Sequence, residues 1–173
     1  MMLINVLSNR SHRMTAFVLF LISFLALGIA YLFEFFGGIK PCALCIYQRF
    51  PHMIIIGLCI IGILFVKKEK PAAIITGISA LLFFIGAGIA SFHVGVEHHW
   101  WQGTTGCGAE LKGTSIEALR SQLLKIPITR CDEVSWSLFG LSLAGYNAII
   151  SIAAGGFSVL RAYRFIKYGT KNE

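Results

Sequence analysis

The stretch PCALCIYQRFPHMIIIGLCIIGILFV, residues 41–66, decides the fold of this chain. Its apolar part, residues 46–66, is about 20 residues long, enough for a helix to cross a hydrocarbon core of ~30 Å at a rise of ~1.5 Å per residue. Pro51 would suit the first turn of a helix, but a start there leaves too few apolar residues before Lys67. The helix is therefore expected to begin near Cys45 and to bend around Pro51.

Three other apolar stretches have similar lengths: residues 14–33, 72–92 and 138–159. With 56% hydrophobic and 13% charged residues, the chain cannot be a soluble domain with a polar surface. The first stretch is too long for the apolar region of a cleaved signal peptide, which is typically ~7–15 residues, so it is expected to stay as an anchor. The sequence predicts one membrane domain, residues 1–173, an all-α bundle of four membrane-spanning helices.

Basic residues predict the orientation of this bundle. Nine of the fifteen Lys and Arg residues flank the spans on one side: Arg10, Arg13, Lys67, Lys68, Lys70, Arg161, Arg164, Lys167 and Lys171. The positive-inside tendency makes that side cytoplasmic, together with both termini. Loops 34–45 and 93–135 then lie on the outer side of the membrane, and the chain is a multi-pass membrane protein. The net charge of +7 fits this topology and the anionic headgroups of the lipid bilayer, so no nucleic-acid partner is expected.

The long second loop contains a helical pattern of its own. Thr114 and Glu117 have the spacing of a capping box, and Pro127 ends the pattern. The apolar residues on one face are Ile116, Leu119 and Leu123. Residues 115–125 are therefore predicted to form a short amphipathic helix that lies on the outer leaflet.

The first cysteine pair, Cys42 and Cys45, stands at the start of the second span. Its CxxC spacing fits half of a zinc site, a structural disulfide or a redox pair, and a helix start stabilises a thiolate. Arg49 follows Cys45 by one helical turn on the same face. A cation about a turn into a membrane helix is costly and usually has a partner or a role, and the candidate partners are the Cys45 thiolate and an oxygen atom of a bound ligand.

The second pair, Cys107 and Cys131, lies 24 residues apart in the long loop. A disulfide between them would be a plausible staple in an oxidising compartment. Two dithiol pairs on one face of the membrane, one of them CxxC, instead favour exchange between the pairs. The sequence thus predicts a thiol–disulfide relay, whereas Cys59, in the middle of a span, is expected only to pack.

Polar and aromatic residues gather where the third span ends. His93 and Glu97 are four residues apart, and His98 follows on an adjacent helical face. This group would suit a zinc ion, a quinone carbonyl or simply the headgroup region, where Trp100 and Trp101 form an interfacial belt. No tight Cys/His tetrad spacing is present, so no metal site is expected.

Several of these residues resemble the bacterial disulfide bond formation protein B (DsbB) family, the quinone-dependent thiol oxidoreductases of the inner membrane. Residues 41–49, Pro-Cys-Ala-Leu-Cys-Ile-Tyr-Gln-Arg, resemble the family's first-loop motif. Residues 93–97, His-Val-Gly-Val-Glu, with Trp101 and Cys107, are similar to the start of its second outer loop. The end of that loop is matched by Cys131, Trp136, Phe139, Gly140, Leu141 and Ser142.

The resemblance implies a role for each of the four cysteines. Cys107 would form a mixed disulfide with a periplasmic thioredoxin-fold dithiol oxidase, a DsbA-like protein. Cys131 would shuttle by pairing with Cys42, and Cys45 would present its thiolate to ubiquinone or menaquinone. Electrons would thereby pass from the partner protein into the membrane quinone pool, the oxidant that keeps the bacterial periplasm oxidising.

The resemblance also implies two cofactor-binding residues. Arg49 would stabilise a quinone oxygen or the charge formed beside it, and His98 matches a family histidine close to the quinone. One departure stands at Gln48, where the family also carries glutamate. That difference alters the local charge and leaves the sulfur chemistry intact.

Three alternatives compete with this interpretation. A vitamin K epoxide reductase-like quinone oxidoreductase is also a helical bundle with paired cysteines, but its CxxC comes late in the bundle, whereas here it opens the second span. A metal-binding membrane protein would hold zinc through the cysteines. A structural four-span scaffold would use both pairs as staples.

Overall fold

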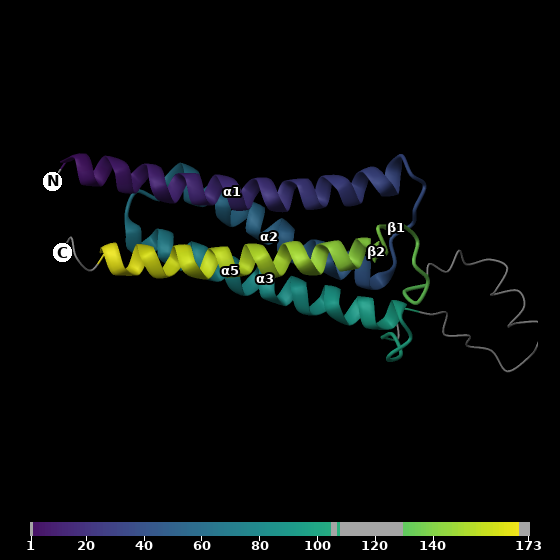
Figure 1. Cartoon of the computed structure of the whole chain (residues 1–173). Helices are drawn as coiled ribbons and strands as arrows, with labels where there is room; N and C mark the ends of the chain where they lie inside the picture. The colour runs from purple at the N-terminus through teal and green to yellow at the C-terminus, as the bar shows by residue number, and fades with distance from the viewer. Residues whose placement is uncertain (1, 105–106, 108–129, 170–173) are drawn as a thin grey trace, which may run out of the picture.

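The computed structural model describes residues 2–104, 107 and 130–169. Four long helices run side by side in an elongated bundle (Figure 1): α1 (Met2–Phe35), α2 (Ala43–Phe65), α3 (Glu69–Glu97) and α5 (Leu143–Gly169). Each contains a stretch long and apolar enough to cross a membrane. The predicted all-α, four-helix membrane fold is therefore confirmed. The amphipathic helix predicted for residues 115–125 lies outside the described residues.

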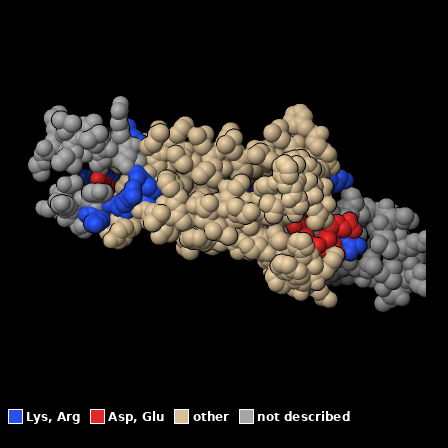
Figure 2. All heavy atoms as spheres, viewed as in Figure 1, with Lys and Arg blue, Asp and Glu red and all other residues tan. Residues whose placement is uncertain are grey.

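The helices alternate in direction. The segment between α1 and α2 and the segment that follows α3 therefore leave the bundle at the same end. The N- and C-terminal ends of the chain lie together at the opposite end (Figure 1). We call the end formed by the close of α1 and α3 and the start of α2 and α5 the cysteine end. Figure 2 shows uncharged residues covering the sides of the bundle, with Lys and Arg gathered at the terminal end and Asp and Glu mostly at the cysteine end. This distribution matches the charge asymmetry expected from the sequence.

Helix α2 begins two residues earlier than the expected start near Cys45. Cys42 is its N-cap, with φ −78° and ψ 171°, and the Cys42 sulfur accepts a hydrogen bond from the backbone N–H of Cys45 at 3.2 Å. Pro51 lies inside the helix, as predicted, and is buried. It faces α3, where a Cβ added to Gly86 would lie 3.6 Å from the Pro51 Cβ.

The fourth span differs from the expected residues 138–159. Helix α5 begins at Leu143, and the preceding residues form an antiparallel hairpin of β1 (Ser137–Leu138) and β2 (Leu141–Ser142). At the turn, Phe139 has φ 51° and Gly140 has φ 79°. Two consecutive residues with positive φ match the twist of a two-residue hairpin and exclude an α-helix. The apolar composition of residues 138–142 therefore concealed a turn.

The centre of the bundle is a tightly packed apolar core. Leu19 of α1, Ile55 of α2 and Phe83 of α3 are almost completely buried there. Cys59 belongs to the same core and has only 1% of its surface exposed, in agreement with a packing role. The core holds α2 against its neighbours and so fixes where the CxxC pair lies.

Candidate active site

The structure brings all four loop cysteines together at the cysteine end. Cys42, Cys107 and Cys131 are buried in one apolar cluster with Leu44 and Val96. The remaining cysteine of the CxxC pair, at position 45, packs against this cluster. Cys107 and Cys131 form a disulfide with a Cα–Cα distance of 5.0 Å. The sequence predicted only that the two cysteine pairs lie on the same face of the membrane. The structure brings them together in one site.

The CxxC pair is in the dithiol form and is internally hydrogen-bonded. The Cys42 thiol donates to the Cys45 sulfur across a Sγ–Sγ distance of 2.8 Å. This hydrogen bond, together with burial of the thiol, raises the pKa of Cys42. The proton of the reduced pair therefore stays on Cys42. The Cys45 sulfur accepts this hydrogen bond. Cys45 lies within α2 and is only partly buried.

Arg49 has a partner that the sequence did not reveal. Its Nη1 lies 2.5 Å from Oε2 of Glu34 in the last turn of α1, and its guanidinium lies 4.6 Å from the centre of the Tyr31 ring. The Arg49 Nε atom is buried and has no hydrogen-bond partner among the described residues. One N–H donor of this cation is therefore still available to a ligand.

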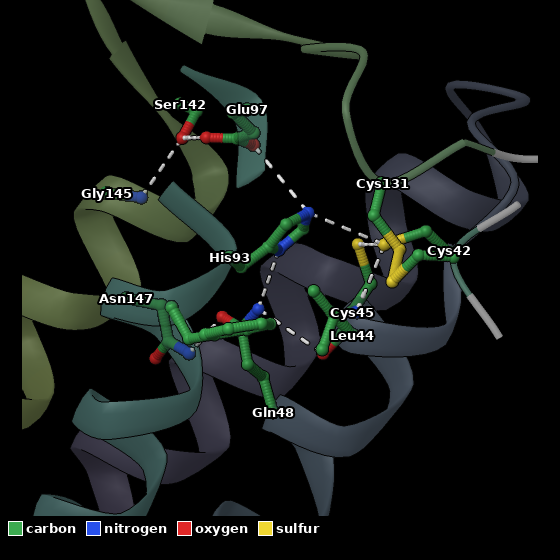
Figure 3. A network of polar contacts seen from close by, with 12 residues as sticks. Cys42, Leu44, Cys45, Gln48, His93, Glu97, Cys131, Ser142, Gly145 and Asn147 are labelled. Carbon is green, nitrogen blue, oxygen red and sulfur yellow. Dashed lines mark hydrogen bonds and ion pairs between the residues drawn. A yellow bond between two sulfur atoms is a disulfide. The ribbon is translucent and has the colours of Figure 1, made fainter. Parts of the chain in front are cut away.

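His93 occupies the centre of the polar contacts around the CxxC pair (Figure 3). Its Nε2 lies 3.6 Å from Sγ of Cys42, and its Nδ1 lies 2.9 Å from Nε2 of Gln48. Nε2 is also 3.9 Å from Oε1 of Glu97, whose other oxygen accepts a hydrogen bond from the Ser142 hydroxyl at 2.5 Å. The sequence indicated His93 only as one member of a polar group, and burial sets it apart.

His98, the histidine indicated by the family resemblance, lies elsewhere. Helix α3 ends at Glu97, so His98 is its C-cap and its exposed side chain stacks on Trp100 with the ring centres 5.3 Å apart. It does not line the cavity beside Cys45. Its quinone-binding role stays a prediction, whereas His93 and Glu97 do line that cavity.

A chain of buried and partly buried hydrogen bonds continues from Gln48 into the bundle. Asn147 of α5 donates to Oε1 of Gln48 at 2.7 Å, and its own oxygen lies 3.0 Å from Nε2 of His52. Ser151 donates to the same Asn147 oxygen at 3.2 Å, and Ser23 lies 3.3 Å from Nδ1 of His52. Polar side chains inside membrane spans usually mark a functional site. Polar residues within three otherwise apolar spans were the sequence feature that could have predicted this network.

A cavity of about 350 Å³ adjoins the CxxC pair and lies among α1, α2, α5 and the hairpin. Its walls are mainly apolar, and Cys45, Arg49, His52 and Asn147 are among its polar lining residues. This volume and this pattern of a few polar groups in an apolar wall are typical of small-molecule sites. The cavity suits an apolar ligand with hydrogen-bond acceptors near Cys45 and Arg49.

Cys42, Cys45 and His93 have ligand atoms within 4.8 Å of one another, which raises the possibility of metal binding. Tetrahedral zinc with Zn–S bonds of ~2.3 Å holds two sulfur atoms about 3.8 Å apart. The two sulfur atoms here are 2.8 Å apart. Their geometry is that of a hydrogen-bonded dithiol, so the cysteines would have to separate before they could chelate zinc.

Comparison with known proteins identifies the family. A model of the family described as disulfide bond formation protein DsbB matches residues 12–161. The disulfide bond formation protein B of Psychrobacter sp. (strain PRwf-1) is 28% identical over 166 residues, 92% of this chain and 96% of that protein. That of Methylococcus capsulatus is 30% identical over 155 residues, 85% and 92% of the two chains. An uncharacterized protein of Rickettsia prowazekii is 28% identical over 154 residues, 87% and 88% of the two chains.

No solved structure matches the chain significantly. The family match favours neither the vitamin K epoxide reductase-like nor the metal-binding alternative. It agrees with the sequence motifs and with the clustered cysteine pairs at one end of a membrane bundle. The chain belongs to the disulfide bond formation protein DsbB family and is a disulfide-generating oxidoreductase of the membrane.

Proposed function

We propose that this protein reoxidises a periplasmic thioredoxin-fold dithiol oxidase of the DsbA type and passes the electrons to membrane quinone. One observation carries the proposal: both cysteine pairs lie in a single buried cluster, and one pair borders an apolar cavity. Thiol–disulfide exchange requires the attacking sulfur to reach a disulfide sulfur, and this cluster supplies that proximity. The cavity provides a place where electrons leave the sulfur atoms.

Exchange between the pairs follows from the two disulfides of the fully oxidised protein. A partner thiolate attacks Cys107, which forms a mixed disulfide and releases the Cys131 thiolate. Cys131 then attacks Cys42 of the Cys42–Cys45 disulfide, which forms the Cys42–Cys131 bond and releases Cys45 as a thiolate. Each step makes one S–S bond and breaks one, so the electron pair moves towards the cavity.

The cavity residues fit a quinone ring. Arg49 offers a buried Nε–H without a partner, which suits a quinone oxygen, and the apolar walls suit the ring and its hydrocarbon tail. Ubiquinone or menaquinone, when bound, supplies an acceptor for two electrons and two protons. Glu34 holds the Arg49 guanidinium in place, so that its charge stays beside the Cys45 sulfur.

We also propose that the cysteine end faces the periplasm of a bacterial inner membrane and that both termini are cytoplasmic. The basic side chains gathered at the terminal end support this orientation (Figure 2). With this orientation the outer pair meets a soluble partner, while the cavity remains at the level of the bilayer.

An anaerobic mixing experiment tests the proposed function. Oxidised protein loaded with ubiquinone is mixed with a reduced DsbA-type oxidase, and quinone absorbance is followed together with thiol counts. One quinone should be reduced for each partner disulfide formed, and Cys107→Ser should abolish both signals. Partner oxidation without quinone reduction, or continued turnover of Cys107→Ser, would contradict the proposal. Addition of a zinc chelator serves as a control and should leave turnover unchanged.

A further inference from the structure

His93 makes contacts that the relay described above does not use. It projects from α3 to within 3.6 Å of the Cys42 sulfur, although α3 contributes no cysteine of its own (Figure 3). Only 4% of its surface is exposed. A buried imidazole against a reacting sulfur atom can donate a hydrogen bond to it or accept a proton from it. The neighbouring side chains decide between these two roles.

The hydrogen bonds of Gln48 fix which of its amide atoms faces His93. The amide group that lies 3.3 Å from the Leu44 carbonyl must be the NH₂ group, because two carbonyl oxygens cannot form a hydrogen bond with each other. The same NH₂ group donates to Nδ1 of His93 at 2.9 Å. The Gln48 oxygen accepts from Asn147 at 2.7 Å, which supports this orientation from the other side.

The tautomer of His93 follows from this arrangement. Since Nδ1 accepts a hydrogen bond from Gln48, the proton of the neutral ring is carried by Nε2. Nε2 faces the Cys42 sulfur at 3.6 Å, a normal distance for a hydrogen bond to sulfur. Glu97 lies beyond hydrogen-bond distance, at 3.9 Å, and its second oxygen is bound by Ser142. The Nε2–H group therefore has two acceptors, the Cys42 sulfur at 3.6 Å and the backbone carbonyl of Cys131.

We propose that His93 is a catalytic hydrogen-bond donor to Cys42, held in the donating tautomer by Gln48 and Asn147. The inference rests on the proposed relay and adds a residue to it. The second thiolate of the partner first attacks the mixed disulfide, which releases the oxidised partner and the Cys107 thiolate. When that thiolate attacks Cys131 of the Cys42–Cys131 disulfide, the Cys107–Cys131 bond forms and the Cys42–Cys131 bond breaks. The electron pair leaves on the Cys42 sulfur.

The His93 Nε2–H group stabilises the negative charge that develops on Cys42 in this step. The backbone N–H of Cys45 donates to the same sulfur at 3.2 Å, so the thiolate receives two donors from two different helices. His93 thereby assists the release of Cys42 and restores the outer disulfide.

The test isolates the Cys42 thiol in the full-length protein. In a Cys45→Ala, Cys59→Ala background with the outer disulfide intact, Cys42 is the one reduced cysteine. Its rate of reaction with a small alkylating reagent is measured across pH by mass spectrometry and normalised to the plateau at high pH. Neither quinone nor partner is present, so the result is independent of whether the proposed function is correct.

At pH values below the plateau, His93→Leu should lower the normalised rate by about ten-fold to a hundred-fold. This is the range expected when a charged sulfur loses a hydrogen bond. His93→Gln, whose amide N–H can reach the position of Nε2–H, should recover most of this loss. The matched control is His99→Asn, an exposed histidine with positive φ at the end of the same helix, where asparagine is tolerated. This control should titrate like the parent protein.

A His93→Leu protein that titrates like the parent would overturn the proposal. Should that variant fail to fold, Gln48→Met supplies a second measurement, because it removes the group that fixes the tautomer and keeps a similar volume. It should lower the normalised rate in the same direction as His93→Leu. An unchanged rate in Gln48→Met would equally contradict a donor role.

Discussion

Gly95→Ala is predicted to destabilise the segment that leads to Cys107. A Cβ at this position would lie 2.0 Å from Cζ2 and 2.3 Å from Cε2 of Trp101. Non-bonded carbon atoms pack at ~3.5–4.0 Å, so the indole must move by about 1.5 Å. The ring is held by a 2.9 Å hydrogen bond from its Nε1 to the Phe92 carbonyl and by stacking on Phe92, with the ring centres 5.7 Å apart.

The magnitude follows from what the displaced ring loses. The hydrogen bond contributes about 0.5–1.5 kcal/mol and the aromatic contact about 0.5–1.5 kcal/mol, which gives about 1–3 kcal/mol. Gly88→Ala is the matched control on the same helix, because a Cβ there meets nothing within 4 Å. Both variants gain the same helix propensity, up to ~1 kcal/mol, which cancels in the comparison.

The assay is the free energy of unfolding in titrations with a denaturing detergent, followed by tryptophan fluorescence. Gly95→Ala should be less stable than Gly88→Ala by about 1–3 kcal/mol and should show a changed native emission. Equal stability of the two variants, with unchanged emission, would refute the close contact between Gly95 and Trp101.

Three further outcomes are expected. Arg49→Ala should raise the KM for quinone more than it slows exchange with the partner protein, measured as separate half-reactions; an equal loss in both would make Arg49 structural. Cys59→Ala should leave turnover unchanged, since this thiol lies in the core, and lost turnover would contradict a packing role. Phe139→Asn should stabilise the hairpin by about 1 kcal/mol, because asparagine tolerates positive φ better than phenylalanine, and a lower melting temperature would count against this.

The spans could be predicted from the sequence because lipid imposes a simple requirement. A helix that crosses the bilayer needs about 20 apolar residues, and that length is visible without any tertiary contact. The start of α5 was predicted too early because hydropathy counts Leu138 and Phe139 as apolar. The positive φ of Phe139 and Gly140 keeps these residues out of the helix, which begins only at Leu143. The number of apolar residues in a stretch does not reveal the backbone conformation of a turn within it.

The site was predictable only in part. The two cysteine pairs were identified from their spacing and the even number of spans, but the partner of Arg49 depends on how the last turn of α1 meets α2. The distinction between His93 and His98 depends on which face of α3 packs inside the bundle. His93 is buried within the helix, whereas His98 is its exposed C-cap.

The most direct test of the central claim asks whether sulfur atoms of the two outer segments meet. In a Cys45→Ser, Cys107→Ser variant, Cys42 and Cys131 retain no original partner, and mild oxidation followed by proteolysis and non-reducing mass spectrometry reports their pairing. The account predicts a nearly complete intramolecular Cys42–Cys131 disulfide, and none between Cys59 and Cys131 when Cys42 is also changed to serine. Free thiols, or disulfides only between molecules, would contradict it.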